Sequence, residues 1–185
     1  MVLEQTQIVA NTKKYFATAT KLGFMNDELM GFLGEDFIKA PASTSTNLHN
    51  AVEGGLIDHL LNVTKYAVLI NDSLPEGEKV DKNSLVKVCL LHQIGKAKLY
   101  SPISWKSNTG IKYEFNNELL SMRVSERSVF YATSHGINLT EEEYIAILNF
   151  DKVDDKMAEY HNTMLGDLLK MGATLAIKHE KNAVK

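Results

Sequence analysis

Two histidines are the residues in this chain that most readily suggest chemistry. His59 ends the run Glu53-Gly-Gly-Leu-Ile-Asp-His59, and His92 lies in the run Leu90-Leu-His-Gln-Ile-Gly-Lys96. Each falls in a stretch predicted to be helical, so two helices would each offer one imidazole to a shared site. Such a pair can bind a divalent metal, but tight binding needs further ligands and outer partners. On spacing alone, two core histidines with purely structural roles are the more common arrangement.

The elements that would position these histidines are mostly helices. Leu56, Leu60, Val63 and Ala67 form an apolar stripe at helical spacing before and after His59. The same periodicity predicts helices over 3–22, from 26 to about 35, over 84–92, from 125, from 140 and over 160–179. Asn26 is a predicted helix cap, and Thr140 begins a predicted capping box. We expect the lysine-rich end of the chain, residues 176–185, to fray into solvent.

One stretch departs from the helical pattern. Ile111, Tyr113 and Phe115 alternate with Lys112 and Glu114, and the turn-forming run 108–110 precedes them. Alternation next to a glycine-containing turn predicts a β-hairpin within residues 98–116.

Composition limits the classes of protein that need to be considered. The 185 residues are 44% hydrophobic and 23% charged, with a formal net charge of −3, so they predict one globular domain over 1–185. The charge balance gives no signal for nucleic-acid binding. No apolar run approaches the ~18 residues of a membrane span. The only cysteine, Cys89, lies in an apolar run and is predicted to be a buried structural thiol, and we expect a cytoplasmic location.

The order of several short motifs resembles the HD phosphohydrolase superfamily of bacteria and phages. The family's opening motif is similar to a stretch that contains the run 41–44, His49, the Gly-Gly pair, His59 and residues 62–63. Its second motif is similar to Leu90–Lys96. Later elements at 125–129 and 139–147 are similar to those of one HD subgroup. The resemblance implies an all-α, HD-like helical bundle with a small β-hairpin. Its core would span about 40–178, with N-terminal helices 3–35 packed on it.

The resemblance also implies which positions should hold metal ions. His59 and His92 match, but Gln93 replaces the aspartate of the His-Asp pair. Three further ligand positions are occupied by side chains without donor atoms, namely Val124, Phe150 and Ala173. With both carboxylates of the family pattern gone, we expect no anionic group to balance a metal pair and no bound cofactor. The alternative is an altered site that binds a divalent metal such as Mn, Ni or Fe.

Four acidic or histidine residues are candidate replacements for the lost ligands. Asp151 follows Phe150 but would point ~100° away from it on a helix. His135 has no counterpart in the family pattern, and Asp167 and His161 lie near the last helix. We expect all of these to be surface polar residues.

Two basic residues remain at positions that the resemblance places near a substrate phosphate. Lys96 and Arg127 together could bind an anion without a metal, because phosphate recognition needs only donors and positive charge. The alternative for Lys96 is that it ends its helix and interacts favourably with the helix dipole.

The combined hypothesis is a catalytically inactive pseudoenzyme that acts as a protein-interaction or assembly module. It would bind a protein partner or self-associate, and a small anionic or nucleotide ligand is a further candidate. The alternative is an active metal-dependent phosphohydrolase that acts on a nucleotide or another phosphate ester at an altered site.

Overall fold

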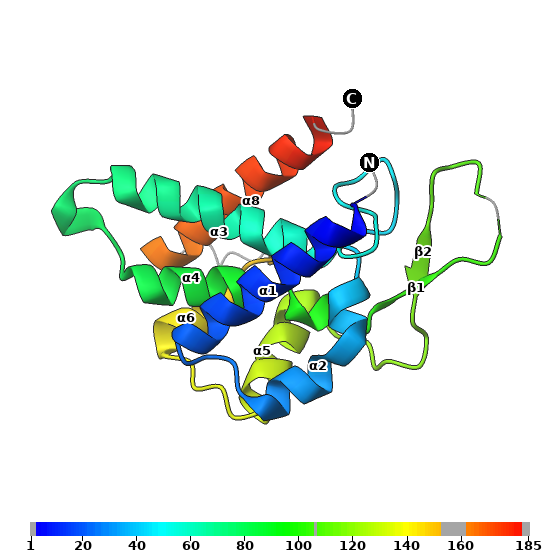
Figure 1. Cartoon of the computed structure of the whole chain (residues 1–185). Coiled ribbons are helices and arrows are strands. Elements are labelled where there is room, and N and C mark those ends of the chain that lie inside the picture. Colours follow the sequence, from blue (N-terminus) through cyan, green and yellow to red (C-terminus); the bar gives the residue numbers. More distant parts are fainter. Residues whose placement is uncertain (1–2, 106, 153–161, 183–185) are drawn as a thin grey trace.

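The computed structural model describes residues 3–105, 107–152 and 162–182 of the chain, and helices make up most of it (Figure 1). In chain order the helices are α1 (Gln5–Lys21), α2 (Asp27–Lys39), α3 (Gly55–Ser73), α4 (Lys82–Leu91), α5 (Val124–Ser134), α6 (Glu141–Leu148) and α8 (Met164–Asn182). Two 3-10 turns, η1 (Glu76–Glu78) and η2 (Ile94–Lys96), and two short strands complete the list. The all-α prediction with a small hairpin is confirmed.

Helix α3 lies at the centre of the molecule and packs most closely against α8. Leu56, Leu60, Val63 and Ala67 are fully buried along one stripe, as their helical spacing predicted. The two helices approach closely at Gly172, where an added Cβ would lie 2.8 Å from the Cβ of Ala67. Glycine at this point therefore sets how near α8 can come to α3.

The N-terminal helices pack on this central pair. The hydroxyl of Tyr15 in α1 donates a hydrogen bond to the carbonyl of Leu90 in α4, at 2.9 Å. The side chain of Asn26 accepts a hydrogen bond from the backbone N–H of Leu29 at 2.8 Å, so the predicted cap of α2 is confirmed. The Tyr15 contact attaches α1 to the helix that ends at His92.

The predicted hairpin forms where the alternating residues placed it. Strand β1 (Tyr100–Pro102) pairs antiparallel with β2 (Tyr113–Phe115), and Tyr100 lies opposite Phe115. Figure 1 shows this hairpin extending away from the helical body. Trp105 and Phe115 keep 54% and 59% of their surface exposed, so the hairpin presents apolar side chains to solvent.

The segment after His92 turns sharply and packs on α5. The N–H of Gly95 donates to the hydroxyl of Ser128 at 3.0 Å, and an added Cβ on Gly95 would lie 2.7 Å from the carbonyl oxygen of Val124. Farther along, the side chains of Thr140 and Glu143 each bond to the other's backbone N–H. The predicted capping box at the start of α6 is confirmed.

The last helix differs from its prediction at both ends. Helix α8 begins at Met164 and continues to Asn182, whereas the expected start at residue 160 lies outside the described residues. The prediction that the end of the chain frays was wrong for residues 176–182. They remain helical because Ala176 and Glu180, one turn apart, are both buried. No described helix combines the length and the apolar character that crossing a membrane requires.

Candidate metal and anion site

The two predicted histidines meet in the core. His59 lies in the second turn of α3, and His92 is the C-cap residue of α4; both are fully buried. Their ring centroids are 6.3 Å apart. The expectation that helix packing buries this pair is confirmed.

A third imidazole joins them from the loop before α3. The ring of His49 lies 4.6 Å from that of His59, centroid to centroid. The sequence placed His49 in the opening motif but gave it no role in the site. Its position follows from the loop that links α2 to α3, where the N–H of Ala42 bonds to the carbonyl of Asn50 and the chain turns back.

A buried carboxylate from the end of α8 completes the cluster. Both oxygens of Glu180 lie 3.0 Å from Nδ1 of His59, and the side-chain N–H of Asn62 donates to one of them at 3.0 Å. Burial raises the pKa of Glu180 to about 7, although the hydrogen bond from Asn62 opposes that rise. The expectation that no anionic group remains was therefore wrong. Residue 180 was missed because it lies in the segment expected to fray.

The hydrogen bonds of His59 and His92 determine which ring nitrogen carries the proton. Nδ1 of His92 lies 2.8 Å from the carbonyl of Cys89, and because a carbonyl only accepts, Nδ1 is protonated. An ionised Glu180 likewise only accepts, which places the proton of His59 on Nδ1. In both rings Nε2 is then the nitrogen with the free lone pair.

Four polar atoms of the cluster are buried without a hydrogen-bond partner among the described residues. They are Nε2 of His49, His59 and His92, and Oε1 of Gln93. Leaving one buried acceptor unpaired costs about 1–3 kcal/mol, so four in one place indicate that something else satisfies them. All four can bind a cation or accept a hydrogen bond.

The histidines of the cluster are held in their neutral form. Burial lowers the pKa of His49 and of His59 to about 3, and it lowers the pKa of His92 well below its ordinary value. The nearby positive charge of Lys96 adds to each decrease. Neutral imidazole is the form that binds metal ions, so no proton has to leave before binding.

Lys96 places its ammonium group among these rings. The side chain is 8% exposed, and Nζ donates to the carbonyl of Ala42 at 2.6 Å. Burial lowers its pKa to about 8, while the carboxylates of Glu180 and Asp151 oppose that decrease. Lys96 is thus a buried cation within the cluster, and the prediction of a basic group near the histidines agrees with this position.

Asp151 is not on a helix, contrary to the sequence-based expectation. Helix α6 ends at Leu148, and the carboxylate of Asp151 accepts hydrogen bonds from the backbone N–H and the hydroxyl of Ser125. Its charge is close enough to Lys96 to affect the pKa of that amine. Asp151 therefore caps the start of α5 and contributes negative charge beside the cluster.

Arg127 points to a different partner. Its guanidinium donates to the carbonyl of Leu120, while its Cβ lies beside Gly95 in the packing of α5 on η2. The side chain is buried, with 5% of its surface exposed. Its role in anion binding stays a prediction.

Of the four positions without family ligands, Gln93 and Phe150 lie beside His92. Gln93 follows His92 directly and is buried, Val124 begins α5, and Ala173 is buried on α8. The ring of Phe150 packs edge-on against that of His92, with centroids 4.4 Å apart. Phe150 and Ala173 also line a cavity of about 520 Å³ beside Lys152 and Lys170. No carboxylate stands at any of these four positions.

Among the described residues, one group of donors lies close enough together to hold a divalent ion. His49, His59 and Glu180 each offer a ligand atom, all within 4.8 Å of one another, and Nε2 of His92 is also free. Two adjacent cations need anionic groups to bridge them and offset their charge. The amide of Gln93 and the apolar groups at the other positions supply none. The part of the chain that the structure describes thus retains the imidazoles of a metal site without the bridging carboxylates.

Part of the chain is similar to known proteins. Residues 56–166 match the sequence pattern of the family described as "HD domain". The chain is also 38% identical over 91 residues to a protein of Methanocaldococcus jannaschii named dihydroneopterin 2',3'-cyclic phosphate phosphodiesterase. That match covers 48% of this chain and 35% of the relative, so the chain spans about a third of that protein. No solved structure gives a significant match. His49 and Glu180 lie outside the matched family region.

Proposed function

This chain belongs to the HD domain family, and on that premise we propose that it is a non-hydrolytic binding module with a one-metal site. The residues that would hold the ion are His49 and His59, whose ligand atoms lie within 4.8 Å of each other and of Glu180. The ligand that the module takes is a small phosphate-containing anion. The site would thus retain recognition while losing the two-metal hydrolysis that the family fold supports.

The observation that carries this proposal is the contrast between unpaired nitrogens and missing carboxylates. Three imidazoles have a buried Nε2 without a partner, while Gln93 and Phe150 stand where carboxylate and histidine would complete a second metal position. The free nitrogens favour one bound cation. The replaced positions disfavour a second cation and leave no group beside His92 to accept a proton from water.

A metal ion bound there would act as a Lewis acid and polarise a phosphoryl oxygen. The chain's own groups would do the rest of the binding. Lys96 keeps an ammonium close to the imidazoles, where it complements an anion and not a second cation. Counting Lys96, Glu180 and Asp151, the local charge is near −1, so one divalent ion makes the site net positive. A singly charged phosphate would then restore neutrality.

Metal stoichiometry and hydrolysis measured together test the proposal. Protein purified without chelator is dialysed against Mn²⁺, Ni²⁺, Fe²⁺ or Zn²⁺, and bound metal is counted by elemental analysis. We expect at most one ion per chain, and no turnover of cyclic phosphodiesters or nucleoside monophosphates. Two ions per chain, or turnover that depends on His92, would contradict it. Samples treated with a chelator serve as blanks.

A second candidate function is a single-metal phosphodiesterase. The relative from Methanocaldococcus jannaschii is named as a cyclic phosphate phosphodiesterase, and a cyclic phosphodiester is strained and needs little activation. The same assay separates the two candidates, because only the second predicts metal-dependent ring opening that His59→Ala and His92→Ala abolish.

We propose further that the exposed apolar residues near the hairpin form a surface for self-association. Trp105, Phe115 and Leu120 expose 54%, 59% and 82% of their surface within one short segment. Clustered exposed apolar groups are typical of protein–protein contact sites. Light scattering after size exclusion should detect self-association that Trp105→Ser with Phe115→Ser removes; a monomer at all concentrations would instead favour another partner.

A further inference from the structure

We infer that Glu180, contributed by the last helix, is the positioning residue of the site and fixes His59 with Nε2 free for a ligand. This inference rests on the proposed one-metal function. Glu180 lies outside residues 56–166, so the family match does not include it. Helix α8 would thereby supply a carboxylate to a site whose usual carboxylate positions are lost.

The contact geometry supports an outer position for this carboxylate. Both oxygens of Glu180 lie 3.0 Å from the same nitrogen of His59, Nδ1, which is the nitrogen opposite the unpaired Nε2. A histidine that binds a metal through one nitrogen commonly donates its other N–H to a carboxylate or a backbone carbonyl. His92 shows the second form of this arrangement, since its Nδ1 bonds to the carbonyl of Cys89.

A chain of side-chain hydrogen bonds holds the carboxylate in place. Asn62 donates to Glu180 at 3.0 Å and lies 3.2 Å from a carboxylate oxygen of Asp58. Asp58 in turn accepts from Asn50 and from Asn11, each at 2.8 Å. Glu180 is 2% exposed, so the network orients a group that solvent barely reaches. Such orientation is what a positioning residue requires.

The electrostatic effect of Glu180 acts in the direction that metal binding needs. Its negative charge makes the imidazole of His59 a stronger donor at Nε2 and offsets the ammonium of Lys96, which repels a cation. Loss of an outer partner of this kind typically lowers metal affinity about 10–100-fold. We expect an effect of about that size when Glu180 is replaced.

Glu180 could instead bind the metal directly, because one atom from each of His49, His59 and Glu180 lies within 4.8 Å of the others. In that arrangement the metal would replace the proton on Nδ1 of His59, and Nε2 would carry a buried N–H without a partner. The two arrangements thus predict opposite tautomers for the same ring once the metal is bound, and diamagnetic Zn²⁺ allows that tautomer to be measured.

The experiment reads the His59 tautomer and the metal affinity separately. Long-range ¹H–¹⁵N spectra at about pH 8, where Glu180 is ionised, should show His59 protonated at Nδ1 both without metal and with Zn²⁺ bound. Glu180→Leu removes the acceptor and should give signals from both tautomers. Calorimetric titration with Zn²⁺ should show about 10–100-fold weaker binding for Glu180→Gln. Glu35→Gln, which removes an exposed carboxylate from α2, is the charge-matched control and should bind as the wild type does.

The outcomes distinguish this inference from the proposed function. If the wild type shows the Nδ1 tautomer but takes up no metal, the one-metal proposal is contradicted. The positioning role of Glu180 is retained in that case. A Zn²⁺-loaded wild type with His59 protonated at Nε2 overturns the inference in favour of direct ligation. Unchanged Zn²⁺ affinity in Glu180→Gln also overturns it. If the leucine variant fails to fold, the wild-type spectrum and the glutamine variant still decide.

Discussion

The aromatic ring of Phe150 packs edge-on against the imidazole of His92, with their centroids 4.4 Å apart. An apolar ring therefore occupies the side of His92 where the resemblance to the HD family expects a further metal-binding histidine. The contact explains why a single cation fits this cluster better than two, and it suggests how the second position could be restored.

Restoring the four replaced positions should return a second metal ion. We expect the variant with Gln93→Asp, Val124→His, Phe150→His and Ala173→Asp to bind about two Mn²⁺ or Fe²⁺ per chain, because the added carboxylates and imidazoles can hold a metal pair. Each single change should leave the stoichiometry nearly unchanged, since ligands act as a set. Elemental analysis makes the measurement. A folded quadruple variant without added metal would mean that the residue correspondence is wrong.

Adding one methyl group where α8 meets α3 should destabilise the protein. In Gly172→Ala the new Cβ would lie 2.8 Å from both the Cβ of Ala67 and the carbonyl oxygen of Val63, so α8 must move away. We expect a loss of about 1–3 kcal/mol in the free energy of unfolding, measured by urea denaturation. Gly31→Ala is the matched control, because nothing lies within 4 Å of its Cβ position. Equal stability of the two variants would contradict the observed helix packing.

Removing the buried cation should cost stability as well as charge. Lys96→Ala leaves the carbonyl of Ala42 without its 2.6 Å partner, and an unpaired buried carbonyl costs about 1–3 kcal/mol. The surface variant Lys82→Ala, whose side chain is 56% exposed in its ion pair with Asp72, should change stability by less than about 1 kcal/mol. Chemical denaturation compares the two. A neutral effect of Lys96→Ala would show that water replaces the lysine without cost.

The metal-free protein should lose stability on mild acidification. Burial lowers the pKa of His49 and His59 from 6.5 to about 3, so below pH 6.5 the unfolded chain binds protons that the folded chain does not. The stability that these neutral rings allow is present above that pH and declines as the pH falls toward 3. Glu180 acts in the opposite direction, since its folded pKa of about 7 exceeds 4.5, but it is one group against three histidines.

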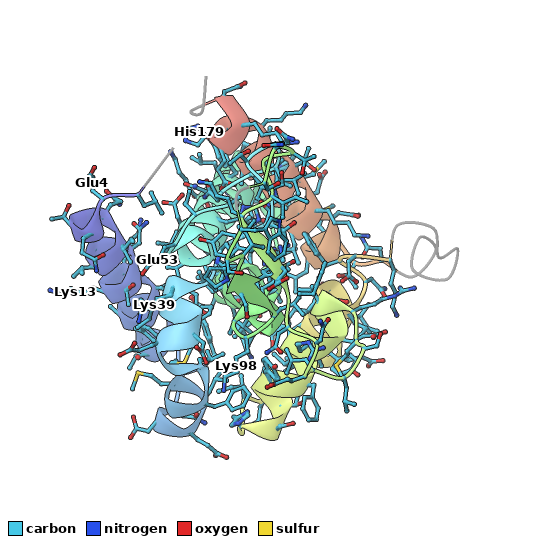
Figure 2. The ribbon with its side chains drawn as sticks, turned by 90° about the vertical axis from the view of Figure 1, so that its right-hand side faces the viewer. Glu4, Lys13, Lys39, Glu53, Lys98 and His179 are labelled. Carbon is cyan, nitrogen blue, oxygen red and sulfur yellow. The ribbon has the colours of Figure 1, made fainter. Side chains whose placement is uncertain are left out.

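Denaturation midpoints between about pH 7 and pH 5 measure this decline. The exposed Lys13, labelled in Figure 2, provides the control, and Lys13→Gln should not alter the slope. A flat profile over this range would mean that the buried rings gain protons as easily as free ones do.

The sequence by itself determined the helical elements, their caps and the hairpin. Apolar spacing, Asn26, the Thr140 capping box and the alternation of 111–115 are local signals, and local hydrogen bonds and side-chain periodicity largely decide such elements. It also identified His59, His92 and Lys96 as neighbours, through motifs whose order fits the HD family.

Only the tertiary structure decided what surrounds those histidines. His59 and Glu180 are separated by 121 positions, and no local pattern links them. Their contact depends on how closely α8 packs on α3, which Gly172 permits, and on burial, which keeps the end of α8 helical. Asp151 likewise reaches the cluster because α6 ends at Leu148 and turns the chain toward Ser125. Burial and long-range packing therefore set the charge and the tautomers of the site, since both depend on groups that are distant in the sequence.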